Sequence, residues 1–124
     1  MVYEDEYVAV FPTLNPINEG HLLVIPKKHA SSLSDLDPED AGRLMKIAQK
    51  MDVALRKSKF KCEAVGLSMA DGEAAGQEVF HVHLHVAPRY KGDGYGFKID
   101  PTQHLIKQER HKLDAVADEV KRNL

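Results

Sequence analysis

The residues best suited to chemistry in this chain are three histidines at alternate positions. Residues 79–88 read VFHVHLHVAP, in which single apolar residues separate His81, His83 and His85. Successive side chains of a strand point to opposite faces, so the three imidazoles share one face while the residues between them face a core. Neighbouring imidazoles on such a row start roughly 6.5 to 7 Å apart, close enough to meet one phosphate-sized group.

The pattern alone leaves three uses of this row open. A solvated strand face is the plainest, but the chain holds only 7 histidines, and three in one cluster argue against chance. Zinc is the second use, because imidazoles are its commonest nitrogen ligands and an open three-histidine site could activate water. Three same-face positions splay too widely to surround one ion easily, although His21 could add a fourth ligand. Phosphate chemistry is the third use.

A glycine-rich loop before the histidines favours phosphate chemistry. Residues 71–77 read DGEAAGQ, and Gly72 and Gly76 lack the Cβ that would stop backbone N–H groups from turning inward. Such a loop can form an anion-binding concavity, although an ordinary strand connection could use the same residues. A histidine with the ordinary pKa of about 6.5 is largely neutral at pH 7, so its lone pair can attack phosphorus without a strong base.

Strands around one long helix are predicted to position these groups. Hydrophobic alternation and turn residues predict strands at 7–11, 21–26, 63–70 and 78–88. A helix is predicted over residues 38–57, with Asp37 as its N-cap and Pro38 at its first position. A second amphipathic helix is predicted in the last dozen residues. Clustered strands beside helices indicate an α+β fold with a largely antiparallel sheet.

Composition limits the class of protein. The 124 residues are 43% hydrophobic and 29% charged, which is typical of one globular domain. A net charge of -2 gives no global field that would attract nucleic acid or an anionic membrane. The acidic start, the lack of a long apolar stretch and the single Cys62 predict a cytoplasmic chain without signal peptide or disulfide.

Two blocks of the chain resemble the histidine triad (HIT) superfamily of nucleotide hydrolases and transferases. They are GHLLVIPKKH at residues 20–29 and DGEAAGQEVFHVHLHVAPR at residues 71–89. With the helix between them, the likeness covers nearly the whole chain. The resemblance implies a single HIT domain over residues 1–124, with a mostly antiparallel five-stranded sheet, one long helix packed on it and a C-terminal helix. It also implies a homodimer whose two sheets join.

The resemblance further implies a role for each histidine. His83 would be the nucleophile that forms a covalent nucleotidyl intermediate, with the proton on its other nitrogen donated to the backbone carbonyl of His81. His85 would bind non-bridging phosphate oxygens, and His21 would support the row through the ring of His81. Nucleotide contacts are implied for Phe11, Thr13, Leu14, Gly76, Gln77, Glu78, His83 and His85. For Phe11 and Leu14, ordinary core or strand packing is the alternative.

Three positions depart from the family pattern. Thr13 replaces the Asp or Asn that grips the ribose, Ala70 replaces an amide on the leaving-group side, and Glu78 replaces a Ser or Thr beside the phosphate. Hint-like and Fhit-like features are mixed, so the substrate stays open between nucleoside phosphoramidates and dinucleoside polyphosphates.

Two basic stretches are less informative. Lys27, Lys28 and His29 are interpreted as a solvated turn in preference to a substrate contact. Arg89 and Lys91 could draw a phosphate chain to the edge of the site.

The resulting hypothesis is a HIT-family hydrolase or transferase that cleaves a small nucleotide, expected to be a purine nucleotide, at its α-phosphorus. No metal or other cofactor is expected to be required, because the nucleophile is a side chain, and no nucleic-acid or membrane partner is expected. One alternative is a nucleotide-binding regulatory or scaffold protein with slow turnover. The other is a zinc-dependent hydrolase.

Overall fold

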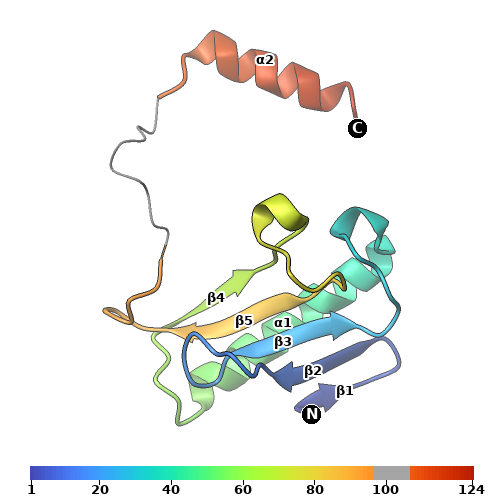
Figure 1. The fold of residues 1–124 in the computed structure, drawn as a ribbon. Coiled ribbons are helices and arrows are strands. Elements are labelled where there is room, and N and C mark those ends of the chain that lie inside the picture. Colours follow the sequence, from blue (N-terminus) through green and yellow to red (C-terminus); the bar gives the residue numbers. More distant parts are fainter. Residues whose placement is uncertain (97–106) are drawn as a thin grey trace.

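The computed structural model describes residues 1–96 and 107–124. Within these residues, five strands form one antiparallel sheet in the order β1-β2-β3-β5-β4, shown in Figure 1. The strands are β1 (Tyr3–Glu4), β2 (Val8–Pro12), β3 (Leu22–Pro26), β4 (Ala64–Ser68) and β5 (Leu84–Arg89). The helices are α1 (Pro38–Lys57) and α2 (Arg110–Lys121), with short 3-10 turns η1 (Leu33–Asp35) and η2 (Glu73–Ala75). The predicted α+β fold with an antiparallel sheet is confirmed.

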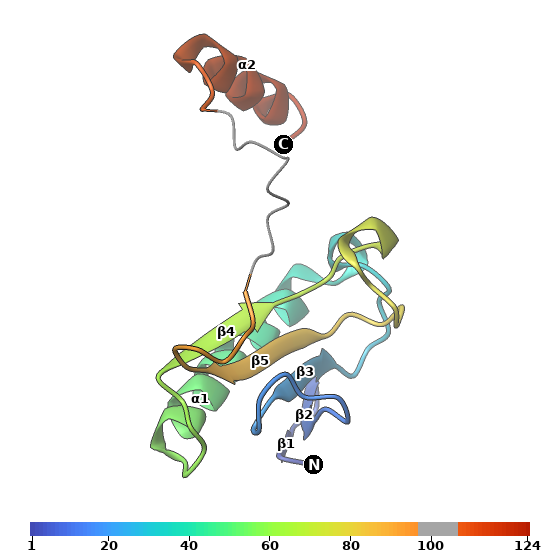
Figure 2. The same cartoon turned by 60° about the vertical axis from the view of Figure 1, so that its left-hand side comes forward.

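Helix α1 covers one face of the sheet (Figures 1 and 2). It starts at Asp37, whose carboxylate accepts the N–H of Glu39 at 2.8 Å, and Pro38 occupies the first turn, where no backbone N–H partner is needed. The apolar stripe of the helix is buried against the inward-facing residues of the strands. These core residues include Val8, Val10, Leu22, Val24, Leu84 and Val86 from the sheet and Leu44, Ile47, Ala48, Met51 and Leu55 from α1. The opposite face of the sheet is therefore free for a site.

The predicted strand through all three histidines is wrong in its first half, because β5 begins only at Leu84. Before that point the chain leaves the ladder with β3, and Val82 donates its N–H to the carbonyl of Ala30 at 2.8 Å instead. The alternation of faces survives, since Val82 is only 2% exposed. The three histidines are half-buried on the other side. The row is thus held partly by a strand and partly by a connection.

Helix α2 confirms the predicted C-terminal helix. Its apolar side chains, among them Leu113, Val116 and Val120, are exposed. Across the described ranges, neither helix has the length and apolar character that a bilayer span requires.

Candidate active site

One row of side chains crosses four strands on the sheet face opposite α1. Phe11 of β2 lies opposite Leu23 of β3, Leu23 lies opposite His85 of β5, and His85 lies opposite Ser68 of β4. Directly paired residues of antiparallel strands point to the same face, so these side chains are neighbours. The histidine row therefore begins at His85 on this face and continues through His83 and His81 beyond the end of the ladder.

A backbone acceptor fixes the ring of His83. Its Nδ1 lies 2.7 Å from the carbonyl oxygen of His81, which is the contact that the sequence analysis expected. A carbonyl can only accept a hydrogen bond, so Nδ1 carries the proton. In the neutral ring the lone pair is then on Nε2. His83 therefore offers the nitrogen that a nucleophile needs.

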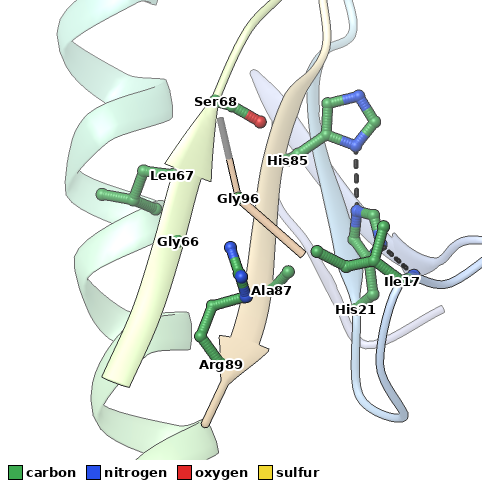
Figure 3. A pocket seen from close by; sticks show the side chains of 9 residues that line it. All are labelled: Ile17, His21, Gly66, Leu67, Ser68, His85, Ala87, Arg89 and Gly96. Atoms are coloured by element: carbon green, nitrogen blue, oxygen red, sulfur yellow. Dashed lines mark hydrogen bonds between the residues drawn. The ribbon is translucent and has the colours of Figure 1, made fainter. Parts of the chain in front are cut away.

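A second chain of hydrogen bonds sets the tautomer of His85 (Figure 3). The backbone N–H of Ile17 donates to His21 Nδ1 at 3.2 Å, so the proton of neutral His21 is on Nε2. That Nε2 lies 2.9 Å from His85 Nδ1, which must accept. The remaining proton of His85 is on Nε2, where it can be donated to a phosphate oxygen.

The expected support of His81 by His21 is wrong, because His21 contacts His85. The antiparallel register between β3 and β5 explains why His21 contacts His85 and not His81. Leu22 of β3 pairs with Val86 of β5, so the residue just before β3 lies beside the strand half of the histidine row. Family likeness correctly pointed to His21 but assigned it to the other end of the row.

Burial keeps this pair of imidazoles neutral. Desolvation lowers the pKa of His21, and the neighbouring charge of a protonated His85 would lower it further. Desolvation also lowers the pKa of His85, with a smaller repulsion from His83. Both effects disfavour the imidazolium form. The neutral tautomers that the hydrogen bonds require are therefore also the forms that the surroundings favour.

The lowered pKa values predict a loss of stability at mildly acidic pH. In the unfolded chain both histidines protonate near their ordinary pKa of about 6.5, before they do so in the folded protein. The free energy of unfolding is therefore unaffected by these two groups well above pH 6.5, and it falls as the pH drops below that value toward their lowered folded-state pKa values. Denaturant titrations between pH 7.5 and 5 should show this slope in the wild type and a flatter one in a His21→Gln, His85→Gln variant. Equal slopes would contradict the assignment.

His29 is a functional candidate that sequence reasoning missed. It is exposed, as the solvated-turn interpretation expected, but its Nδ1 lies 3.1 Å from His81 Nδ1. His81 Nε2 in turn lies 2.8 Å from the carbonyl oxygen of Pro26. The sequence contained a sign of this contact, because His21 and His29 flank β3. A strand that pairs antiparallel with β3 brings residues near both ends of β3 close to His81, His83 and His85.

Two pockets flank the histidine row. The first, about 310 Å³ in volume, is mainly apolar and is lined by Phe11, Leu23, Ile25, Val79, His81 and His83. The second, about 510 Å³, is shown in Figure 3 and is lined by Ile17, His21, Gly66, Leu67, Ser68, His85, Ala87, Arg89 and Gly96. Sequence reasoning named Phe11 but not Leu23 or Ile25. Their alternation with the buried residues of β3 was the available signal.

The glycine-rich loop is held by the side chain of Gln77. Its Oε1 accepts the N–H of Gly72 at 2.8 Å, and its Nε2 donates to the carbonyls of Ser31 at 2.7 Å and Val79 at 3.1 Å. The residue is only 4% exposed. Gly72 and Gly76 have φ values of 102° and 94°, which favour glycine. The Gln77 amide thus holds the loop in shape, and the expected phosphate contact at Gln77 stays a prediction.

The other loop residues lie at one edge of the site. Gly76, Gln77 and Glu78 line a third pocket of about 480 Å³ together with Glu73 and Phe80. Glu78 is exposed. An anion contact from the backbone of this stretch stays a prediction.

Leu14 and Thr13, which follow β2, were expected to contact the nucleotide. Leu14 is 96% exposed, so packing in the core is wrong for it, and it lines none of the three pockets described above. The Thr13 hydroxyl accepts the N–H of Asn15 at 3.3 Å, and Thr13 also lines none of them. A ribose contact from Thr13 stays a prediction.

Arg89 is not free to attract phosphate. Its guanidinium donates to the carboxylate of Asp93 at 2.6 and 3.0 Å and also to the carbonyl of Tyr95. The guanidinium holds the pKa of Asp93 well below its usual range, aided by N–H donors of the surrounding loop. The predicted role of Arg89 as a phosphate anchor is therefore not supported, whereas Lys91 is exposed.

The zinc alternative finds no ligand set in the part of the chain that the structure describes. Residues 1–96 and 107–124 contain no group of three or more His, Cys, Asp or Glu side chains that could hold a metal ion. The histidines are arranged as imidazole pairs, which is the geometry of a hydrogen-bonded row.

Comparison with known proteins identifies the family of this chain. The family model described as the HIT domain matches residues 1–92, which include β3 with its flanking histidines, the loop between β4 and β5, and the histidine row. The chain belongs to the HIT family. Its relatives include a HIT-like protein of Borreliella burgdorferi, 45% identical over 98 residues, which cover 78% of this chain and 70% of that protein. The recognised HIT superfamily and its fold are thereby confirmed.

Two further relatives bear on fold and chemistry. A crystal structure of a HIT family protein from Bacillus anthracis superposes with a TM-score of 0.88 at 34% identity, covering 99% of this HIT protein and 86% of the other chain. The asymmetrical bis(5'-nucleosyl)-tetraphosphatase of Schizosaccharomyces pombe is 38% identical over 91 residues, which cover 73% of this chain and 50% of the yeast protein. Membership in the HIT family supports nucleotide hydrolysis or transfer at the level of the family.

Proposed function

We propose that this protein cleaves a small nucleotide at its α-phosphorus through a covalent bond to His83. The observation that carries the proposal is the set of tautomers that fixed partners impose on the row. His83 presents a lone pair at Nε2 because its Nδ1 proton is donated to the His81 carbonyl, and His85 presents an N–H at Nε2 because His21 occupies its Nδ1. A nucleophile and an oxyanion donor thus stand side by side, with ring centroids 5.0 Å apart.

The proposed reaction has two steps. In the first, the lone pair of His83 Nε2 attacks the α-phosphorus, a P–N bond forms, and the bond from phosphorus to the leaving group breaks with the electron pair going to the leaving group. His85 Nε2–H stabilises charge on a non-bridging oxygen. In the second step water attacks the same phosphorus and loses a proton to the solvent, which balances the proton that the leaving group takes up. The P–N bond breaks with its electron pair returning to His83 Nε2, and the mononucleotide is released. The ring of His83 returns to its starting tautomer.

The two pockets suggest where the parts of the substrate bind. The apolar pocket formed by Phe11, Leu23, Ile25 and Val79 suits the flat face of a base, because aromatic and aliphatic side chains bury such a surface favourably. The pocket on the far side of His85, which carries the Ser68 hydroxyl, is then left for the departing group. For the substrate class we propose nucleoside phosphoramidates or dinucleoside polyphosphates, the second supported by the yeast tetraphosphatase relative.

Intact-mass measurement tests the proposal most directly. Brief mixing with an adenosine phosphoramidate or a diadenosine polyphosphate should yield protein heavier by one nucleotidyl group. The adduct should decay in water and should form equally after exhaustive treatment with a chelator, because the nucleophile is a side chain. Absence of both adduct and turnover would favour the scaffold alternative, and loss of activity on chelation would favour the zinc-dependent one.

We also propose that the protein acts as a homodimer joined through β4. This strand is the last of the described sheet, and its Leu67 is 45% exposed on the edge. Light scattering at micromolar concentration should give twice the mass of the chain. The cytoplasmic location and the preference for a purine stay predictions.

A further inference from the structure

Both outer histidines of the row are paired with a histidine that flanks β3. His21, just before β3, pairs with His85, and His29, three residues after its end, pairs with His81. The two pairs are alike in geometry, with ring centroids 5.1 Å apart and interplanar angles of 56° and 53°. The nucleophile proposed above lies between them, but only the His21 pair has a role so far.

Backbone chemistry decides which ring of the second pair donates. His81 Nε2 must carry a proton, because its partner 2.8 Å away is the Pro26 carbonyl, which can only accept. With one proton per ring, His81 Nδ1 is then an acceptor. The N–H between the two rings therefore belongs to His29 Nδ1, at 3.1 Å from its acceptor. His29 thus holds His81 in the tautomer in which its Nε2–H is donated to Pro26.

The position of His81 matters because its carbonyl holds His83. Residues 81–83 lie before β5, so the ladder of the sheet does not fix them. Besides the packing of Val82 in the core, this stretch is held by a few hydrogen bonds. They are the Val82 N–H to Ala30, the His81 ring to Pro26 and to His29, and the His83 ring to the His81 carbonyl. Each of them carries a larger share of the positioning than it would inside a strand.

We infer that His29 is a positioning residue that acts through His81 to hold the carbonyl that orients the His83 nucleophile. The inference rests on the proposed function of His83 and extends it to a side chain outside the triad. His29 does not line the pocket assigned to the base, so it should affect the rate of the chemical step more than substrate binding.

Three substitutions separate a hydrogen-bonding role from simple packing. His29→Asn keeps a donor near the place of Nδ1, His29→Asp offers only an acceptor, and His29→Ala removes the contact. We expect kcat to fall about tenfold in the alanine and aspartate variants, with KM unchanged, because small misplacements of a nucleophile are costly. The asparagine variant should stay within about twofold of the wild type. Lys28→Ala, an exposed neighbour, is the matched control and should be unaffected.

A readout without substrate keeps the inference independent of the proposed reaction. Nitrogen-15 NMR of the imidazole rings should show His81 protonated at Nε2 and bare at Nδ1 in the wild type and in His29→Asn. In His29→Ala the ring should exchange between tautomers. Unchanged His81 signals in His29→Ala, or equal loss of kcat in the asparagine and alanine variants, would overturn the role of His29. A wild type that shows these signals but turns over neither substrate would instead refute only the proposed function.

Discussion

Replacing His83 with alanine should lower kcat/KM for the nucleotide substrate by at least about a thousandfold, because alanine has no lone pair with which to form the covalent intermediate. The fold should survive, since His83 lies half-buried on the open face of the sheet. Steady-state assays with the phosphoramidate and the dinucleoside polyphosphate would measure the loss, and the nucleotidyl adduct should be absent from the mass spectrum.

His111→Ala is the matched control for this substitution. His111 lies on α2 and is exposed, so its loss removes the same side chain from a place far from the row in sequence and leaves turnover intact. If His83→Ala kept even a tenth of the wild-type rate, the covalent mechanism would have to be abandoned in favour of direct attack by water.

Replacing Gln77 with alanine should weaken both the fold and the reaction. The substitution removes the partner of the Gly72 N–H and of the carbonyls of Ser31 and Val79. Buried polar groups that lose their partners cost about 1–3 kcal/mol, so a loss of that size in the free energy of unfolding is expected. Activity should fall about tenfold or more, because the loop that precedes the histidines would no longer be held in one shape.

Two comparisons sharpen this test. Gln49→Ala removes the same side chain from an exposed position on α1 and should leave stability and turnover nearly unchanged. Gln77→Glu keeps the acceptor for Gly72 but places a carboxylate against two carbonyls, so it should be at least as damaging as alanine. Loss of activity in Gln77→Ala with full stability would instead mean that the amide touches the substrate.

The parts of the fold that could be predicted are those set by local patterns. Helix α1 was expected over residues 38–57 and forms over Pro38–Lys57, because an N-cap, a proline in the first turn and a long apolar stripe act together. The start of β5 was missed by several residues. Alternation of faces persists through His81 and His83 without any strand partner, so periodicity alone cannot locate the end of a ladder.

In the site, too, contacts between residues close in sequence could be predicted and contacts between distant residues could not. The tautomer of His83 depends on its neighbour two residues away and was expected, whereas the pairing of His21 with His85 depends on the register between β3 and β5. The commitment of Gln77 to backbone groups likewise depends on a carbonyl 46 residues away, at Ser31. Contacts that require a tertiary register or a folded loop do not follow from sequence spacing.

The two histidines that flank β3 make the geometry of the site depend on the register between β3 and β5. Each reaches one end of the row, and β3 and β5 are antiparallel. A slip of β3 by two residues, about 6.5 Å, would therefore separate both imidazole pairs at once. A sheet in which β3 and β5 pair in the wrong register would still bury its apolar face. Its histidines, however, would no longer be held in the tautomers that the reaction requires. During refolding, recovery of activity should report native pairing of β3 with β5 more faithfully than the return of secondary structure does.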